Sequence, residues 1–333
     1  MNGLSANKEN GRLLWLDFGR AAGMFIVLLV HAGAGPAVVR YYGGMFYMPI
    51  FFVAAGYVYR RRDGEFLGSF LRKKASRLLL PYFGTSAFLW TFFCAKDAEL
   101  KWSSLFGILF SRNQMYQVGF AGENPVLLDI LNAPLWFLTA LFAVYLWYEI
   151  AERSGRKQLL LALGLLFSIL WHYGTEILLP WSLDAVPYFA CFFYAGERLR
   201  EWELTRRRLW ILPLLLVFVV GARINGSVNL SCGDYGVSML LYLAVGTSGS
   251  YLIFAAGASV ERYCEPVARL ISLIGQETLT ILCFHMFLFM FIRAGVALLG
   301  LSELLTDVLL VAGSMIMLTA AGRAWRAWKK GRA

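Results

Sequence analysis

Long apolar segments recur along this chain from one end to the other, separated by short polar ones. A membrane-crossing helix needs roughly 20 mostly apolar residues to cross roughly 30 Å of hydrocarbon. The runs Leu159–Trp171, Leu209–Gly221 and Met239–Gly257 have this character, and they lack the period-two alternation of a transmembrane barrel. The pattern therefore predicts a helical bundle with about ten spans, near residues 13–34, 43–60, 76–95, 132–150, 157–174, 182–199, 207–223, 235–257, 270–293 and 304–323.

Composition agrees with this pattern. Of the 333 residues, 59% are hydrophobic and 16% are charged, whereas about a quarter of the residues in a soluble domain are charged. The length would suit two soluble domains, but the apolar segments continue through the whole chain. We therefore expect one integral membrane domain of the all-α class over residues 1–333, with short tails at about 1–12 and 324–333.

The basic residues alternate between the two sides of the expected bundle. If the N-terminus lies inside, 24 of the 31 Lys and Arg residues fall on inner segments and 6 on outer ones, and Arg20 lies within the first span. This bias follows the positive-inside rule and predicts that both termini are cytoplasmic. The net charge of +10 then reflects topology, so nucleic acid is not an expected partner.

The first apolar segment is expected to remain as a helix and not to be removed as a signal peptide. It contains Asp17 and Arg20, and no small-residue cleavage site follows it before the next span. The five cysteines have no C-x-x-C spacing, so we expect no metal site.

Two segments between spans allow more than one interpretation. The long outer segment 95–131 contains Trp102–Phe110, which is either a helix in the membrane interface or part of a lid or acceptor-binding loop. The inner segment 60–77 is dense in cations. They serve either as the positive-inside signal with anionic lipid contacts or as a site for a polyanionic cytoplasmic ligand.

Ionisable side chains inside a span are costly, so they are candidates for function. The first span carries Asp17, Arg20 and His31. Arg20 and His31 are eleven residues apart, so they project from nearly the same face, about 16 Å apart along the helix. Asp17 is placed to pair with Arg20. The structural alternatives are a snorkelling arginine and a buried histidine bonded to a carbonyl.

A second histidine lies at a similar depth on another span. His285 falls in the outer half of the ninth span, and two imidazoles at matched depth on different helices can converge on one cavity. In the second span, Met48-Pro49 predicts a kink that frees backbone carbonyls.

Amides and an aromatic side chain are expected at the same level. Asn132 and Trp136 begin the fourth span, and Asn225 lies in an outer loop. Such groups suit sugar binding, although a tryptophan at a span end is equally what an aromatic belt predicts.

Several short motifs follow one another in order over roughly residues 13–290. They are Trp15-Leu-Asp-Phe-Gly-Arg20 through His31, Phe46-Tyr-Met-Pro-Ile-Phe-Phe52 with Ala55-Gly-Tyr57, Lys73-Lys-Ala-Ser-Arg77 with Pro81-Tyr82, Pro134-Leu-Trp-Phe-Leu138, Leu183-Asp184 with Phe192-Phe-Tyr-Ala-Gly196, Asn225-Gly226, and Ile274-Gly275 with Phe284-His285. The series resembles acyltransferase family 3 of bacterial membrane acyltransferases, and within it the branch of fucose 4-O-acetylases. Tyr47 and Ala55 depart from that branch, which usually has His and Ser there.

The resemblance implies a membrane O-acyltransferase of the bacterial inner membrane. It would move an acetyl group from cytoplasmic acetyl-CoA to a sugar hydroxyl of an envelope glycan or its lipid-linked precursor, with the bilayer, acyl-CoA and a saccharide as partners and no metal. His31 would act as a general base or briefly take up the acyl group, and His285 or Tyr47 would steady the oxyanion or the leaving thiolate. The CoA phosphates would be held by Arg20, Lys73, Lys74 and Arg77, and the acceptor by Asn132, Trp136 and Asn225.

Two other functions fit parts of the sequence. A transporter or flippase of a lipid-linked saccharide would also have about ten spans with polar residues inside them, although no repeated halves with broken helices are evident. A structural or regulatory subunit with a decayed site would account for Tyr47 and Ala55. It would not account for the joint presence of Arg20, His31 and His285.

Overall fold

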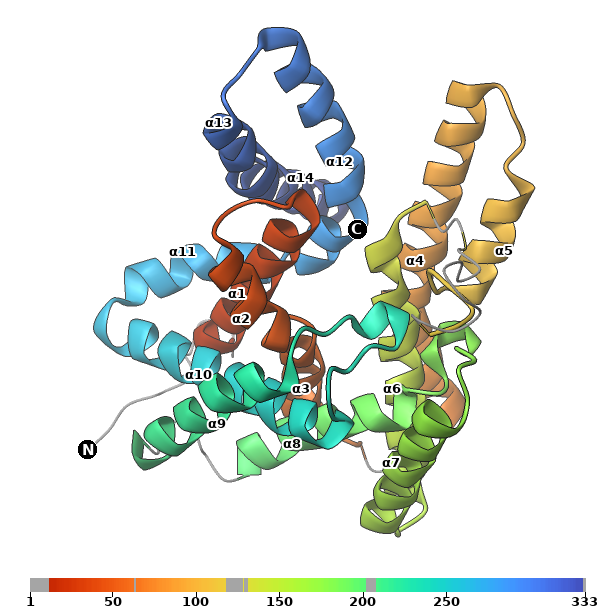
Figure 1. Ribbon diagram of the computed structural model, residues 1–333, viewed down its shortest axis with the longest axis vertical. Coiled ribbons are helices and arrows are strands. Elements are labelled where there is room, and N and C mark those ends of the chain that lie inside the picture. Colours follow the sequence, from red (N-terminus) through yellow and green to blue (C-terminus); the bar gives the residue numbers. More distant parts are fainter. Residues whose placement is uncertain (1–11, 63, 118–127, 129–130, 202–207, 332–333) are drawn as a thin grey trace. The chain divides into compact units, whose positions relative to one another are not determined.

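The computed structural model describes residues 12–62, 64–117, 128, 131–201 and 208–331, and in this part of the chain the elements are helices (Figure 1). Most of the expected tail 1–12 lies outside the described residues. The chain divides into two compact units, each described by itself below. Unit 1 takes residues 1–54, 198–224 and 244–333, and unit 2 takes residues 55–197 and 225–243.

Seven helical segments of the described chain are long and apolar enough to cross a membrane: Leu14–Ala32, Ala37–Val58, Leu67–Asp97, Ala133–Arg153, Met239–Tyr263, Thr278–Leu299 and Glu303–Lys330. The protein is thus an all-helical, multi-pass membrane protein. The other three expected spans fall on α7 (Lys157–Gly174), α8 (Val186–Glu201) and α9 (Ile211–Asn225). These three helices are 15 to 18 residues long, which gives about 23–27 Å at 1.5 Å per residue and falls short of the roughly 30 Å of hydrocarbon.

Helix α1 (Leu14–Ala32) packs in unit 1 against α2 (Ala37–Phe46), α11 (Glu265–Gly275) and α12 (Thr278–Leu299). The approach of α11 is closest at Gly275, because a Cβ atom at that position would overlap the backbone of Asp17. Only a glycine allows the two backbones to come so near.

The helices of unit 1 run in defined directions relative to α1. Ser272, near the end of α11, bonds Asp17 near the start of α1, and His285 of α12 contacts His31 near the end of α1. Helix α12 therefore runs in the same direction as α1. Helix α10 (Met239–Tyr263) runs in the opposite direction, because its last turns, at Glu261, lie against Trp15.

Two expected spans are interrupted. The kink expected at Met48-Pro49 is confirmed: α2 ends at Phe46 and α3 (Pro49–Val58) begins at the proline, which has no N–H to donate to the preceding turn. The segment 270–293, expected as one span, is two helices with a break between Gly275 and Thr278. Glu277 in this break is buried and forms an ion pair with Arg326.

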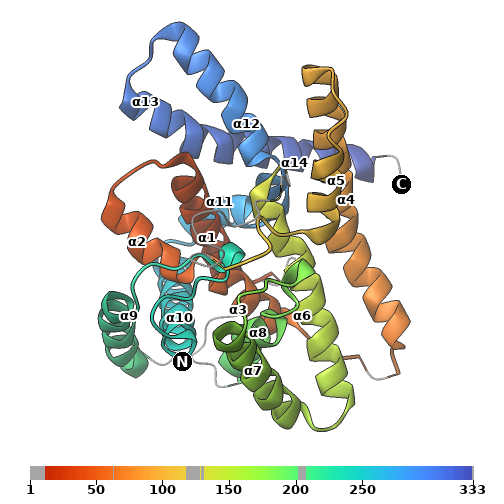
Figure 2. The ribbon, with the colours of Figure 1, turned by 45° about the vertical axis from the view of Figure 1, so that its right-hand side comes forward.

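The last part of unit 1 is the helical segment Glu303–Lys330, with a π-helical turn inside it (Figure 2). Its elements are α13 (Glu303–Val308), the π-helical turn η6 (Leu309–Gly313) and α14 (Ser314–Lys330). The expected tail 324–333 is helical as far as Lys330, and its place outside the membrane stays a prediction. The side chains of Glu277 and Thr280 on α12 lie close to Gly322 of α14.

Unit 2 is built on α4 (Leu67–Asp97) and α6 (Trp136–Arg153), which pack against each other. Helix α5 (Trp102–Phe110) and the 3-10 turns η1 (Ala133–Leu135), η2 (Pro180–Ser182) and η5 (Leu230–Cys232) complete it with α7 and α8. Helix α4 begins nine residues before the expected span at 76. Of the cations expected on this inner loop, Arg72, Lys73, Lys74 and Arg77 therefore lie on a helix, whereas Arg60, Arg61 and Arg62 precede it.

Candidate functional site

Two histidines of unit 1 meet near the end of α1. His31 Nδ1 lies 3.1 Å from His285 Nε2, and the ring centroids are 5.2 Å apart. His285 is fully buried, whereas His31 is partly exposed. The convergence of the two imidazoles expected from their matched depth is therefore present.

The hydrogen bonds assign the protons of this pair. His285 Nδ1 lies 2.9 Å from the Ile281 carbonyl and 3.1 Å from that of Leu282, and a carbonyl only accepts. In the neutral form His285 Nδ1 therefore carries the proton, and Nε2 accepts the N–H of His31 Nδ1. In this tautomer His31 Nε2 carries the lone pair of the ring, and the Val27 carbonyl one turn earlier on α1 also lies within hydrogen-bond reach of this imidazole.

At the other end of α1, a buried carboxylate forms ion pairs with two arginines. Asp17 is 2% exposed and lies 3.4 Å from Arg20 Nη1 and 3.1 Å from Arg12 Nε. The Ser272 hydroxyl of α11 donates to it at 2.9 Å. The pairing expected from the spacing of Asp17 and Arg20 is confirmed. The guanidinium of Arg20 is thus oriented and only partly exposed.

The other three cations assigned to CoA differ in their surroundings. Lys73 forms an ion pair with Glu65 at 2.6 Å, and this hydrogen bond keeps the pKa of the Glu65 carboxyl below its usual value. The Nζ atom of Lys74 lies over the Tyr145 ring, 3.6 Å from its centroid, a cation–π contact. Arg77 is exposed. Of the three, Arg77 is the most accessible to an anion in solution.

The residues assigned to the acceptor belong to unit 2. Asn132 and Trp136 are both buried at the start of α6. Asn225 is fully buried: its Nδ2 donates to the Tyr235 carbonyl at 2.8 Å, and its Oδ1 accepts from the Ser238 N–H at 3.1 Å. Asn225 thus shapes the turn that precedes α10. A contact with the acceptor stays a prediction for all three.

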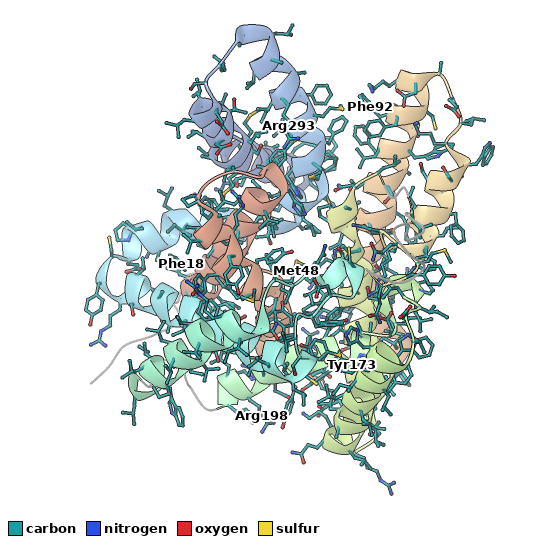
Figure 3. All side chains as sticks on the ribbon, in the orientation of Figure 1. Phe18, Met48, Phe92, Tyr173, Arg198 and Arg293 are labelled. Atoms are coloured by element: carbon teal, nitrogen blue, oxygen red, sulfur yellow. The ribbon has the colours of Figure 1, made fainter. Side chains whose placement is uncertain are left out.

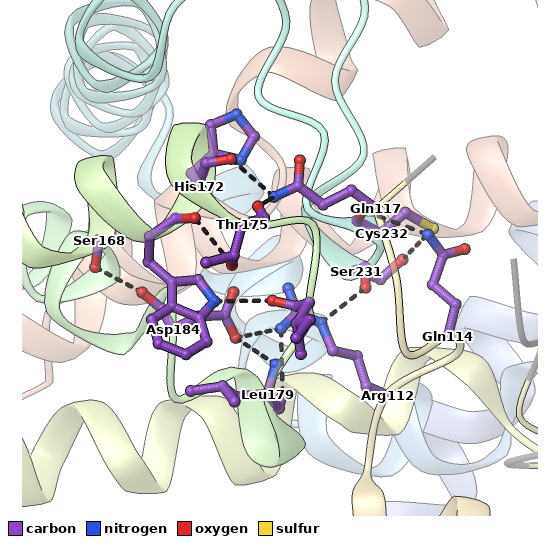
Figure 4. Close-up of polar contacts among 12 residues, drawn as sticks. Arg112, Gln114, Gln117, Ser168, His172, Thr175, Leu179, Asp184, Ser231 and Cys232 are labelled. Carbon is purple, nitrogen blue, oxygen red and sulfur yellow. Dashed lines mark hydrogen bonds and ion pairs between the residues drawn. The ribbon is translucent and has the colours of Figure 1, made fainter. Parts of the chain in front are cut away.

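A polar cluster in unit 2 was missed by sequence reasoning (Figure 4). Arg112, expected on an outer loop, is fully buried and pairs with buried Asp184 at 2.5 Å. Arg112 also donates to the Leu179 and Ser231 carbonyls, so it joins three segments that are distant in the sequence. No spacing rule connects such residues, and the sequence carries no signal for this pair.

The backbone beside this cluster is strained. Ser111, Trp181 and Ser182 have φ values of 55°, 56° and 57°, which cost roughly 1–2 kcal/mol per non-glycine residue. Such conformations persist where the surrounding structure over-determines them. Here the Arg112–Asp184 pair and the Ser111–Thr139 hydroxyl contact at 2.8 Å hold the backbone in place.

Comparison with known proteins decides the family. The family described as "Acyltransferase domain", acyltransferase family 3, matches residues 13–322, which include the helices of the histidine pair. The chain belongs to acyltransferase family 3. This acyltransferase is therefore a membrane-embedded enzyme, as its helices indicate. No curated protein and no solved structure matches the chain.

Proposed function

We propose that this acyltransferase moves an acetyl group from cytoplasmic acetyl-CoA to a sugar hydroxyl of an envelope glycan or its lipid-linked precursor, in the bacterial inner membrane with both termini cytoplasmic. The observation that carries the proposal is the His31–His285 contact, in which His31 Nδ1 donates to His285 Nε2, and His31 Nε2 is the proposed base. The motif series that resembles the fucose 4-O-acetylase branch supports the choice of an acetyl group and a sugar.

His31 Nε2 takes the proton of the acceptor hydroxyl as the oxygen attacks the thioester carbonyl. A C–O bond forms, the C–S bond breaks, and the proton held on His31 Nε2 passes to the leaving CoA thiolate. When His31 becomes positively charged, its Nδ1–H still donates to His285 Nε2, so the cation is stabilised by a neutral neighbour. A transient acyl group on His31 Nε2 uses the same lone pair.

His285 serves this proposal as a positioning residue. The role of steadying an oxyanion needs an N–H that points to substrate, and both of its nitrogens are already engaged by protein atoms. Its contacts instead fix the tautomer and orientation of His31, as a third group orients the base in other acyl-transfer enzymes. Tyr47, a phenol at the end of α2, then remains the candidate donor to the oxyanion or thiolate.

Arg20 is the cation of α1 that serves CoA in this proposal. It lies three turns from His31, about 16 Å along the helix, which suits a ligand whose phosphates and thioester are at opposite ends of a long arm. Its contact with Asp17 holds the guanidinium in place. Lys73, Lys74 and Arg77 are the further phosphate ligands, and Asn132, Trp136 and Asn225 are proposed to hold the sugar.

Release of CoA thiol by the purified full-length protein tests the proposal. With acetyl-CoA and an extract of envelope glycans, we expect CoA release together with a gain of one acetyl mass on a glycan. His31→Ala should abolish both while the protein still purifies as a single species. Near-normal transfer in that variant would refute the assignment, and transport of saccharide without CoA release would favour a flippase.

A further inference from the structure

Two guanidinium groups hold the turn that follows His31. Arg40 Nη1 of α2 donates to the carbonyl oxygens of residues 33–35 at 2.9, 2.9 and 2.5 Å. Arg293, which is labelled on α12 in Figure 3, donates through Nη2 to the carbonyl of Ala32 at 3.2 Å. Both cations are thus fixed on consecutive carbonyls of a single turn.

Neither of these arginines is neutralised by a carboxylate. Among the residues that the structure describes, neither Arg40 nor Arg293 forms an ion pair. The nearby Asp307 accepts instead from the Gly35 N–H, at 3.1 Å. Other arginines of the described chain do pair with Asp or Glu: Arg12, Arg20, Arg112, Arg153, Arg198, Arg269 and Arg326.

Capping the helix does not balance this charge. The C-terminal end of a helix carries roughly half a negative charge, whereas the two guanidiniums carry two positive charges. The contacts with the described residues use one terminal nitrogen of each group, so the other donors of each fork remain for a ligand. Arg293 is exposed and Arg40 is partly exposed.

The two arginines lie next to the histidine pair. The turn held by Arg40 begins two residues after His31, and Arg293 lies two turns beyond His285 on α12. Positive charge is also scarce here: only 6 of the 31 basic residues fall on segments expected outside, and these are two of them. The positive-inside rule therefore does not explain their presence.

We propose that Arg40 and Arg293 form a binding site for a phosphate group of the acceptor. This inference rests on the proposed acyl transfer at His31 and narrows its acceptor to a phosphorylated or phosphate-linked saccharide. A guanidinium fork matches two phosphate oxygens. The two guanidiniums exceed the roughly half negative charge of the helix end and the single Asp307 carboxylate bonded to Gly35, and the remaining positive charge favours a phosphate group.

Binding of inorganic pyrophosphate to the purified full-length protein tests the site without requiring turnover. The titration is made in a phosphate-free detergent with saturating CoA present, so that the sites for the CoA phosphates are filled. We expect Arg40→Gln and Arg293→Gln each to raise the Kd for pyrophosphate by about tenfold or more, the effect of losing a charge-assisted hydrogen bond.

Arg223→Gln is the matched control. Arg223 is also exposed in unit 1 and is bonded to the Tyr42 hydroxyl rather than to a carboxylate, so its loss changes the net charge equally. We expect its Kd to rise clearly less than in the two site variants, because Arg223 is bonded to Tyr42 and not to the turn that follows His31. Equal losses in all three variants, or no loss in the first two, would overturn the proposal.

Two further arms complete the test. If a Gln variant does not purify as one species, Arg40→Lys and Arg293→Lys are used instead, because they keep the charge and lose the guanidinium fork. We then expect the Kd for pyrophosphate to rise several-fold. An unchanged Kd would contradict the site. Phosphatidylglycerol is added in the last arm. If phosphatidylglycerol competes with pyrophosphate, the phosphate that binds this site belongs to a lipid headgroup, and the assignment to the acceptor is overturned. If pyrophosphate binding is undiminished, the assignment to the acceptor is supported.

Discussion

At the scale of single residues, the two histidines have different tasks. The order of hydrogen bonds, from the carbonyls of residues 281 and 282 through His285 to His31, supports the proposed roles, in which His285 orients His31 and His31 Nε2 is the base. The depth of both residues was predictable, because an ionisable group inside an apolar run is visible in the sequence. Which ring orients the other was not predictable, because it depends on carbonyls that every helix has.

The chain of hydrogen bonds predicts how His285 tolerates substitution. His285→Ala removes the acceptor for His31 Nδ1–H, so kcat for acetyl transfer should fall by about 100-fold, within the range of general-base effects. The KM for acetyl-CoA should change little. His285→Gln places an amide oxygen near the former position of Nε2 and should restore much of the rate.

The contrast between these two variants, measured as CoA release, separates positioning from direct catalysis. His285→Leu, a control of similar volume without an acceptor, should behave as the alanine variant does. A glutamine variant as inactive as the leucine variant would contradict a role through the accepted hydrogen bond.

At the scale of elements, the helices followed from apolar runs but their ends and joints did not. The break at Met48-Pro49 was predictable, because a proline inside a helix cannot donate a backbone hydrogen bond to the preceding turn. The break after Gly275 was not, because this glycine is needed for its approach to the Asp17 backbone and nothing nearby in the sequence reveals that contact. Helix α4 starts early because Leu67 to Ser76 continue a helix that composition alone assigned to a charged loop.

The Arg112–Asp184 pair should be essential for joining the loops of unit 2. Arg112→Met leaves a buried carboxylate without its partner, which costs roughly 3–5 kcal/mol. The protein should therefore unfold at a clearly lower temperature in detergent. The double variant Arg112→Met/Asp184→Leu removes both charges and should recover most of the loss.

An exposed pair provides the comparison for this experiment. Arg269 and Glu265 are about half-exposed on one face of α11, so Arg269→Met should cost about 1 kcal/mol or less. A double variant of the buried pair as unstable as its single variant would show that the pair contributes through packing and not through charge.

At the scale of the whole molecule, helix directions bear on the number of spans. Helix α12 runs parallel to α1, and α10 runs antiparallel to it. If only the seven long helices crossed the bilayer, four crossings would separate α1 from α12 and would make the two antiparallel. We therefore expect an odd number of α7, α8 and α9 to cross as well, and the alternation of basic residues favours all three.

Labelling with a membrane-impermeant maleimide in intact cells tests this topology. Single cysteines are introduced by Ser154→Cys and Ser302→Cys in a chain without its five native cysteines. With ten spans and a cytoplasmic N-terminus, residue 302 lies outside and reacts, whereas residue 154 reacts only after lysis. Labelling of residue 302 only after lysis would instead support seven spans.

The proton chain of the histidine pair also ends inside the protein, on carbonyls of α12 that have no proton to pass on. A proton abstracted at His31 therefore has no path of hydrogen bonds through His285 toward the opposite side of the bilayer. It must return along the same face of the imidazole that received it. We therefore expect that expression of this enzyme does not lower the proton-motive force through this pair of histidines.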